Sequence, residues 1–342
     1  MPVIRLVDSD IAFDCAADDT VARAALRAGL GMPYECNVGC CGTCKIELVE
    51  GKIDSAWPAA PALSERDRSR NRVLGCQAQA RGDCTIKVRL DDQYVPRHRP
   101  QRFLARLRAL RDVTHDIREF HFEADQPRPF LCGQYALLDL PGVQGQRAYS
   151  MSNAVNGNGD TTTDWHFQIK RVPGGQGTGM LFDQLQIGAG IALDGPYGGA
   201  YLREDRPRNV ICIAGGSGIS PLLSIARGMM RSKEMADRTL HFFYGGRARR
   251  DLCGQAELAV LPGFGTRLHY HPVLSMPEPG EAWHGLSGFV HEQVLPTLST
   301  LGGMAADYEY YFAGPPVMTQ ATQRLLMQNK VPLSQMHFDQ FY

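Results

Sequence analysis

Hydrophobic and polar residues follow three successive patterns along the chain, and each pattern predicts a different unit. In the first ninety residues, the runs VIRLV, IAFDC, KIELVEGKI and CTIKVRL alternate apolar and polar positions, as half-buried strands do. Residues 16–31 instead carry apolar side chains at helical spacing, with Asp or Thr at the N-cap and Gly29 or Gly31 at the end. These patterns predict a small α+β unit that ends near Leu90.

The middle of the chain has the pattern of a small antiparallel barrel. From Phe103 to about Leu202, short runs such as FLARLRAL, REFHFEAD and WHFQIKRV alternate with Gly, Pro and Asn turns. Just before this stretch, residues 91–102 read DDQYVPRHRPQR. Two prolines, several charges and little apolar content are typical of a linker, which would allow the flanking domains to reorient.

From Arg208 onward, apolar strands alternate with helical segments, beginning with NVICIAGG and PLLSIARGMMRSK. Alternating strands and helices predict a doubly wound, mostly parallel sheet. We therefore expect a multidomain protein of α+β and α/β class. Its domains should lie at residues 1–92, 102–204 and 205–342, with a linker at residues 93–101.

Composition narrows the range of partners. The chain has 36 Lys and Arg residues and 36 Asp and Glu residues, so its formal net charge is zero. No electrostatic field of the whole molecule therefore favours binding to nucleic acid or to an anionic membrane. The N-terminal run is interrupted by Arg5 and Asp8 and resembles no signal peptide, and no stretch of about 18 apolar residues is present to span a bilayer. We expect a cytoplasmic protein that acts as a monomer, without nucleic acid or membrane partners.

Cysteines carry the strongest chemical signal. Ten are present in a chain without a secretory signal, which favours metal ligation or inert burial over disulfides. Cys36, Cys41 and Cys44 form C-x4-C-x2-C, and Cys76 follows, which is the plant-type 2Fe-2S spacing. Cys40 is an alternative to Cys41, although the spacing favours Cys41. Zinc is the other possible occupant, but zinc sites usually pair two C-x2-C units or add histidines.

The remaining cysteines and histidines suggest no further chemistry. Hydrolase signatures such as H-E-x-x-H and G-x-S-x-G are absent, and the ten histidines are scattered. His166 and His337 are predicted to be packed or hydrogen-bonded structural residues. Small buried hydrophobic roles are expected for Cys15, Cys84, Cys132, Cys212 and Cys253.

Several motifs occur together with the cysteines and in a fixed order. They are RAYSMSN at 147–153, GPYG at 195–198, AGGSGISP at 214–221, AGPPVM at 313–318 and the C-terminal HFDQFY. In this combination the chain resembles the ferredoxin–NAD(P)+ reductase superfamily. It is most similar to the reductase components of bacterial multicomponent oxygenases, including those of toluene and related hydrocarbon monooxygenases. The resemblance implies a β-grasp ferredoxin domain, a β-barrel FAD domain and a parallel-sheet NAD domain.

The resemblance assigns FAD to the barrel. It implies that Arg147 holds the pyrophosphate, Tyr149 stacks on the isoalloxazine ring and Ser150 hydrogen-bonds near N5 as a catalytic residue. These roles suit a planar guanidinium, an aromatic face and a hydroxyl. In the segment RVPGGQGTGML, backbone N–H groups and Thr178 would meet the pyrophosphate at a helix N-terminus. The other FAD-contacting residues that it implies are Ala148, Ile169, Lys170, Gly175 and Gly177.

The same resemblance assigns the nicotinamide dinucleotide to the last domain. AGGSGISP follows a strand and opens a helix, as a dinucleotide fingerprint must, but Pro221 stands where the standard fingerprint has its third glycine. The resemblance implies that Ser217 is a second catalytic residue near the nicotinamide and favours NADH, whereas arginines near the end of the second strand suit a 2′-phosphate. The other dinucleotide-site residues are Gly216, Gly218, Arg247, Gly314 and Pro315. For the C-terminal Phe341 or Tyr342 the resemblance implies a ring that covers the flavin where the nicotinamide enters, and simple packing of the chain end is the alternative.

One departure concerns Ala313, which stands where the family commonly has a cysteine that approaches the nicotinamide.

The resemblance implies electron flow from NADH through FAD and the 2Fe-2S cluster to a Rieske ferredoxin or an oxygenase hydroxylase. This is the activity of an NADH:acceptor oxidoreductase in aromatic hydrocarbon catabolism. Two alternatives are a standalone flavin oxidase or quinone reductase, and a redox carrier or sensor without nicotinamide turnover.

Overall fold

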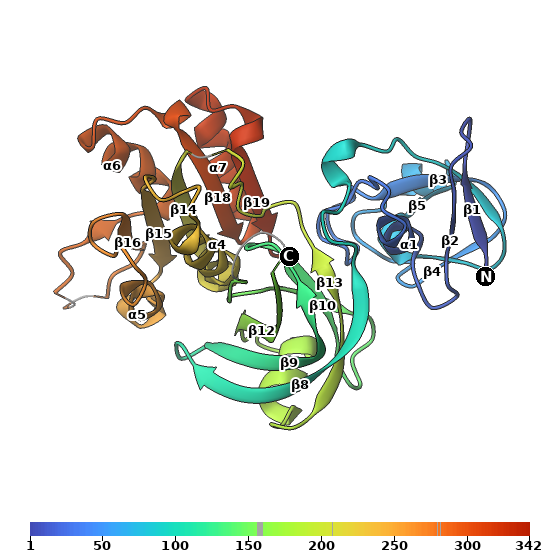
Figure 1. Ribbon diagram of the computed structural model, residues 1–342, viewed down its shortest axis with the longest axis horizontal. Helices are drawn as coiled ribbons and strands as arrows, with labels where there is room; N and C mark the ends of the chain where they lie inside the picture. The colour runs from blue at the N-terminus through green and yellow to red at the C-terminus, as the bar shows by residue number, and fades with distance from the viewer. Residues whose placement is uncertain (156–159, 207, 279, 281) are drawn as a thin grey trace.

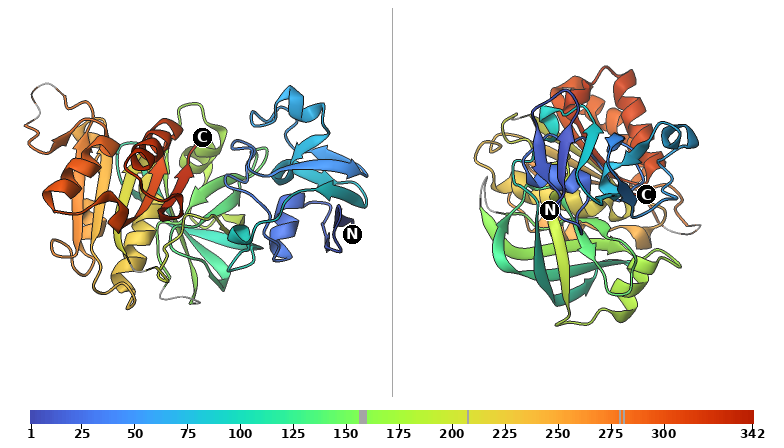
Figure 2. Two further views of the ribbon diagram at one scale, coloured as in Figure 1. Left: turned by 90° about the horizontal axis from the view of Figure 1, so that it is seen from above. Right: turned by 90° about the vertical axis from the view of Figure 1, so that its right-hand side faces the viewer.

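The computed structural model describes residues 1–155, 160–206, 208–278, 280 and 282–342. Three domains follow one another along the chain, and the barrel lies between the other two at the bottom of the view in Figure 1. The chain ends near the centre of the molecule, where the domains meet (Figures 1 and 2).

The first domain is a five-stranded sheet covered by one helix. The strand order is β2-β1-β7-β3-β5, and β1 runs parallel to β7 while its other neighbour is antiparallel. Thr20 is the N-cap of the helix, and Gly29, with φ of +84°, follows its C-terminal end. The elements are β1 (Val3–Leu6), β2 (Ala12–Asp14), α1 (Val21–Arg27), β3 (Lys45–Glu50), β4 (Ile53–Ser55), α2 (Glu65–Arg68), β5 (Arg72–Leu74), β6 (Ala78–Ala80) and β7 (Cys84–Lys87).

The second domain is the predicted antiparallel barrel. Its sheet has the order β11-β10-β13-β8-β9-β12, and a bridge between Met151 and Phe167 links the two edges. Large side chains, including Phe120 and Trp165, fill the interior. The elements are β8 (Gln101–Asp112), β9 (Ile117–Pro129), β10 (Tyr135–Asp139), β11 (Arg147–Ser150), β12 (Thr161–Lys170), α3 (Gln176–Gly179), a π-helical turn at Met180–Gln184 and β13 (Gly190–Tyr197).

The third domain is the predicted doubly wound sheet, and every described strand pair in it is parallel. The strand order is β17-β16-β15-β14-β18-β19, with α4 and α5 on one face and α6 and α7 on the other. The elements are β14 (Asn209–Gly215), α4 (Ile219–Arg231), β15 (Leu240–Gly246), α5 (Gln255–Ala259), β16 (Leu268–Leu274), β17 (Leu286–Ser287), α6 (Val294–Thr300), β18 (Tyr308–Gly314), α7 (Pro316–Gln328) and β19 (Met336–Gln340).

Short 3-10 turns complete the described secondary structure, at Gly75–Gln77, Asp92–Tyr94, Gly216–Gly218, Arg249–Asp251, Val290–Gln293, Ala305–Asp307 and Leu333–Gln335. Strand β19 adds the segment HFDQ to the sheet, which the sequence pattern did not identify as a strand. It places His337 Nε2 2.7 Å from an oxygen of the buried Glu309, which anchors the C-terminal segment. Across the described parts of the chain, no helix is both long and apolar enough to span a bilayer.

The first domain packs tightly against the barrel. Tyr135, Leu137 and Tyr197 of the barrel belong to the hydrophobic core of the first domain. Arg27 of α1 binds both carboxylate oxygens of Asp194 on β13, at 2.9 and 2.7 Å, and also the carbonyl of Pro100 in the linker. These contacts tie the linker and the two domains together, so the structure favours a docked arrangement over a freely swinging first domain.

Candidate functional site

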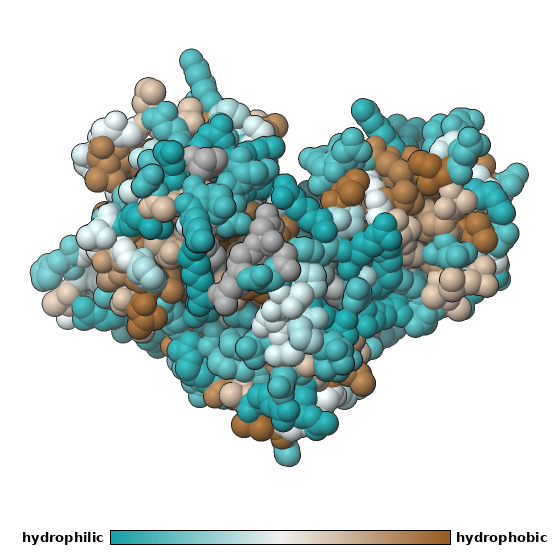
Figure 3. All heavy atoms as spheres, in the orientation of Figure 1, coloured by the Kyte–Doolittle hydropathy of each residue, from teal (hydrophilic) through white to brown (hydrophobic). Residues whose placement is uncertain are grey.

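One cavity of about 2220 Å³ receives residues from all three domains. At the top of the view in Figure 3 a notch separates the first and third domains, and residues of both domains line the cavity. Cys36 and Cys41 line it from the first domain, residues 147–150 line it from β11, and residues 215–217 line it from the end of β14. Segments that are far apart in sequence, each carrying a different predicted chemistry, therefore meet in one space.

The four predicted cluster ligands form two pairs of thiols. The interaction of Cys36 with Cys41 lowers the pKa of the first thiol and raises that of the second, and the interaction of Cys76 with Cys44 does the same. The first pair lies on the cavity wall, whereas Cys44 and Cys76 are buried behind it. The loop that carries three of them is held in conformations that suit glycine, since Gly39 and Gly42 have φ of +95° and +82°.

The cysteine loop suits an iron–sulfur cluster. The backbone N–H groups of Cys40 and Cys41 both point at Cys36 Sγ, each at 3.3 Å, and N–H groups directed at ligand sulfurs are a feature of such sites. Asn37 in the same loop is 1% exposed, and its amide nitrogen and oxygen have no hydrogen-bond partner among the described residues. Sulfur donors and unpaired polar atoms next to them fit a bound cluster.

The RAYS segment forms strand β11, whose four residues all reach the cavity. The Arg147 guanidinium donates to the carbonyls of Gln144 and Gly145 at 3.1 Å each, and these two bonds hold it in the lining of the cavity. Burial raises the pKa of Tyr149 to about 12, so this ring stays neutral. Ser150 is nearly buried, and its carbonyl accepts a hydrogen bond from Ser220 on α4 at 2.7 Å. A flat ring system would meet the strand edge here.

The glycine-rich turn before α3 closes over this strand. A Cβ on Gly177 would lie 3.1 Å from Arg147 Cγ and 3.4 Å from the Tyr149 hydroxyl. A side chain at position 177 would therefore be tight, and Arg147 would have to move by a few tenths of an ångström to admit it. The hydroxyl of Thr178 is already engaged by the backbone N–H and carbonyl of Val172, each at 3.2 Å. The structure therefore gives Thr178 a role in shaping the turn. Ile169, Lys170 and Gly175 also line the cavity.

The dinucleotide segment divides into residues that face the cavity and residues that pack beneath it. Gly216, at φ of +56°, and Ser217 line the cavity, as does Pro315. Gly218 and Gly314 do not belong to the described lining. A Cβ on Gly218 would lie 1.9 Å from the carbonyl oxygen of Ala313, so Gly218 serves the contact between the helix start and β18. Ala313 itself is 2% exposed.

The C-terminal segment supplies more of the site than the sequence predicted. Phe341 and Tyr342 line the cavity, and so does Asp339, which was not among the predicted residues. Burial, reinforced by the nearby Glu35, raises the pKa of Asp339 to about 7. Its Oδ2 is buried without a hydrogen-bond partner among the described residues. Only the position of β19 beside β18 reveals this carboxyl, because a single Asp in HFDQFY is no signal by itself.

Comparison with known proteins agrees with this three-part site. Residues 4–81 match the family of 2Fe-2S iron-sulfur cluster binding domains, residues 104–201 match oxidoreductase FAD-binding domains and residues 212–324 match oxidoreductase NAD-binding domains. The chain is 40% identical to the ferredoxin–NAD(P)+ reductase CarAd of Metapseudomonas resinovorans over 96% of both chains. The chain belongs to the ferredoxin–NAD(P)+ reductase family.

Other members of the family agree in sequence and in fold. The ferredoxin–NAD+ reductase component of the alkene monooxygenase system of Xanthobacter autotrophicus is 37% identical, over 96% of this chain and 97% of its own. The solved structure described as the ferredoxin reductase in carbazole 1,9a-dioxygenase superimposes with a TM-score of 0.89 at 35% identity, covering 100% of this chain and 98% of that one. The protein is thus an electron-transfer oxidoreductase with 2Fe-2S, FAD and NAD domains.

Proposed function

We propose that this reductase takes electrons from NADH and passes them to a Rieske ferredoxin or an oxygenase hydroxylase in an aromatic or hydrocarbon oxygenase system. The observation that carries the proposal is the shared cavity. Its lining contains Cys36 and Cys41, strand β11 and the turn at Gly216–Ser217. Relatives named as components of alkene and xylene/toluene monooxygenase systems support the oxygenase assignment. We further propose a cytoplasmic monomer with the domain boundaries given by the sequence patterns.

The proposed division of labour follows from where the side chains lie. Bound FAD would accept a hydride from NADH and would pass its electrons one at a time to the cluster. Arg147 would bind the pyrophosphate from the mouth of the cavity, and Tyr149 would cover one ring face. Ser150 and Ser217 approach from two different domains, so closing these domains on both cofactors would align the nicotinamide with the flavin and exclude water.

The cluster would be held by Cys36, Cys41, Cys44 and Cys76. Because Cys36 and Cys41 are the pair on the cavity wall, the cluster edge that they hold would face the flavin. Phe341 and Tyr342 line the same cavity from the end of the chain, where they would cover the flavin until the nicotinamide enters. Arg247 and Arg250 line it beyond β15, and the backbone N–H of Arg247 donates to Asp251 Oδ2 at 3.1 Å. We propose NADH as the preferred donor.

An anaerobic titration of the purified holoprotein with NADH, and in parallel with NADPH, tests the proposal. Bleaching of the flavin bands together with the rhombic EPR signal of a reduced 2Fe-2S cluster is expected, at lower concentrations of NADH than of NADPH. Flavin bleaching without that signal would contradict the cluster assignment, and an unbleached flavin would indicate a carrier or sensor. Rapid NADH consumption with oxygen or quinone alone would indicate a standalone oxidase or quinone reductase.

A further inference from the structure

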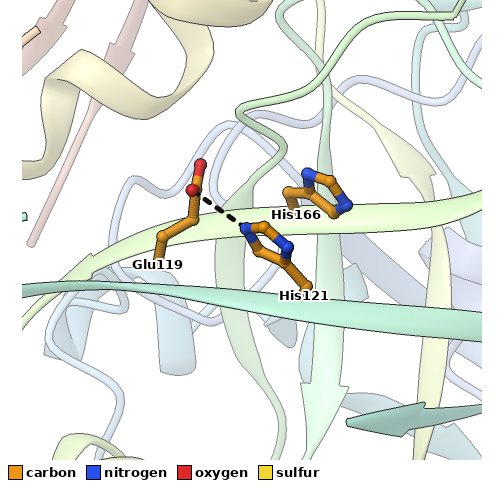
Figure 4. A group of neighbouring side chains, drawn as sticks. All are labelled: Glu119, His121 and His166. Atoms are coloured by element: carbon orange, nitrogen blue, oxygen red, sulfur yellow. Dashed lines mark hydrogen bonds and ion pairs between the residues drawn. The ribbon is translucent and has the colours of Figure 1, made fainter. Parts of the chain in front are cut away.

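We propose that Glu119, His121 and His166 form a binding site for a divalent transition-metal ion, of which Zn²⁺ is the representative. The three side chains lie on the outside of the barrel and come from the adjacent strands β9 and β12 (Figure 4). Their ligand atoms all lie within 4.8 Å of one another. None of them is a residue that the cluster, flavin or nicotinamide proposals use.

Strand register explains why the three residues meet. In the antiparallel pair, His121 is directly opposite His166, and Glu119 is opposite Gln168. Residues two apart on a strand share a face, so Glu119 and His121 project from the same side of β9. The two imidazole rings stack with centroids 3.8 Å apart and planes inclined by 5°, and His121 Nε2 lies 2.9 Å from Glu119 Oε2.

The donor set suits zinc chemistry. Two imidazoles and one carboxylate with an open fourth position are a recognised zinc arrangement, and imidazole nitrogen favours Zn²⁺, Cu²⁺ or Ni²⁺ over Ca²⁺ and Mg²⁺. Zinc bonds of about 2.0 to 2.2 Å place tetrahedral ligand atoms about 3.3 Å apart. Because the two imidazole rings stack in nearly parallel planes, side-chain rotation is needed to bring the ligand atoms, which lie within 4.8 Å of one another, to that spacing.

His166 is available as a ligand. Neither of its ring nitrogens has a hydrogen-bond partner among the described residues, whereas its backbone is fixed by Ser152 and Asn153. An imidazole with no hydrogen-bond partner among the described residues has both ring nitrogens available to coordinate a metal ion.

Space for the ion and a water ligand is present. The three residues line a second cavity of about 680 Å³, which Asp160 and Asp164 also line. These two carboxylates add negative charge that offsets the two arginines of α4 in the same lining, Arg227 and Arg231. Ser152 and Gln168 hold Oε1 of Glu119 at 3.0 and 3.2 Å, so Oε2, beside His121, is the oxygen that would bind the ion. Arg111, which binds Oε2 at 2.9 Å, is also bound to Glu257 at 2.7 Å and so keeps a partner.

Equilibrium dialysis of the flavin- and cluster-loaded protein against Zn²⁺, buffered by a chelator of known affinity, tests the site. We expect one Zn²⁺ per chain, with the iron content unchanged to show that zinc has not displaced the cluster. His166→Gln should weaken zinc binding by more than about 100-fold, because even outer-sphere partners of metal ligands are worth 10- to 100-fold. His121→Gln should do the same.

His271→Gln is the matched control, because it replaces a histidine of the third domain, away from the proposed site. His271 Nε2 lies 3.1 Å from Nδ1 of His241 in the same domain. This variant should bind zinc as the unaltered protein does. Absence of zinc binding by the unaltered protein would overturn the proposal. So would zinc binding that survives both substitutions at 121 and 166, or that is lost in His271→Gln. Unchanged flavin and cluster absorption in each variant shows that a loss of zinc binding does not reflect misfolding.

Discussion

Cys40 and Cys41 are neighbours of the same chemistry, but their side chains have different surroundings. Cys41 lies on the cavity wall and its interaction with Cys36 raises the pKa of its thiol, while burial and repulsion from Cys41 raise the pKa of Cys40. We expect Cys41→Ser to lose the cluster, because a plant-type cluster needs four thiolates at these spacings. Cys40→Ser should keep it. Iron and acid-labile sulfide per chain, with visible absorption, measure this, and cluster loss in Cys40→Ser alone would reverse the assignment.

At the scale of elements, the contact between the start of α4 and strand β18 depends on Gly218. A Cβ there would lie 1.9 Å from Ala313 O and 2.4 Å from its carbonyl carbon, and backbone atoms cannot rotate away. Gly218→Ala should therefore destabilise the protein by about 1–3 kcal/mol, the usual cost of overpacking, and lower its melting temperature. Gly199→Ala is the control, since its Cβ would meet nothing within 4 Å. Equal melting temperatures for the two variants would contradict this account.

At the scale of the whole molecule, the ion pair between Arg27 and Asp194 joins the first domain to the barrel. Asp194 is 1% exposed, so Arg27→Met leaves a buried carboxylate whose remaining partners among the described residues are Tyr197 and the more distant Arg102. Removing one member of a buried pair costs about 3–5 kcal/mol. We expect the docking of the two domains to weaken, so that cluster reduction slows while flavin reduction by NADH keeps its rate.

Stopped-flow absorption resolves the two steps. Arg5→Met is the control, because Arg5 pairs with Asp83 on the surface, where an ion pair contributes little. Cluster reduction in Arg27→Met at the rate of the unaltered protein would show that docking through Asp194 does not set the electron path.

The sequence by itself determined the order and class of the three domains and the cofactors of the protein. Strand alternation, helical spacing and the glycine turns are local properties, and the cysteine spacing lies mostly within one loop. For this reason the α+β, barrel and parallel-sheet patterns and the 2Fe-2S site were predicted correctly from local patterns, whereas the correct FAD and NAD assignments came from the resemblance of the combined motifs to the reductase family.

Only the tertiary structure decided which residues meet across domains. Asp339 enters the main cavity because β19 pairs with β18, and Gly218 and Gly314 lie beneath that cavity because helix and strand pack there. The sequence predicted a structural role for His166, since nothing near it in the chain indicated a ligand. The register between β9 and β12 places His166 against the imidazole of His121, which lies 45 positions earlier in the chain. Such contacts depend on pairing and packing between distant segments, which local patterns do not encode.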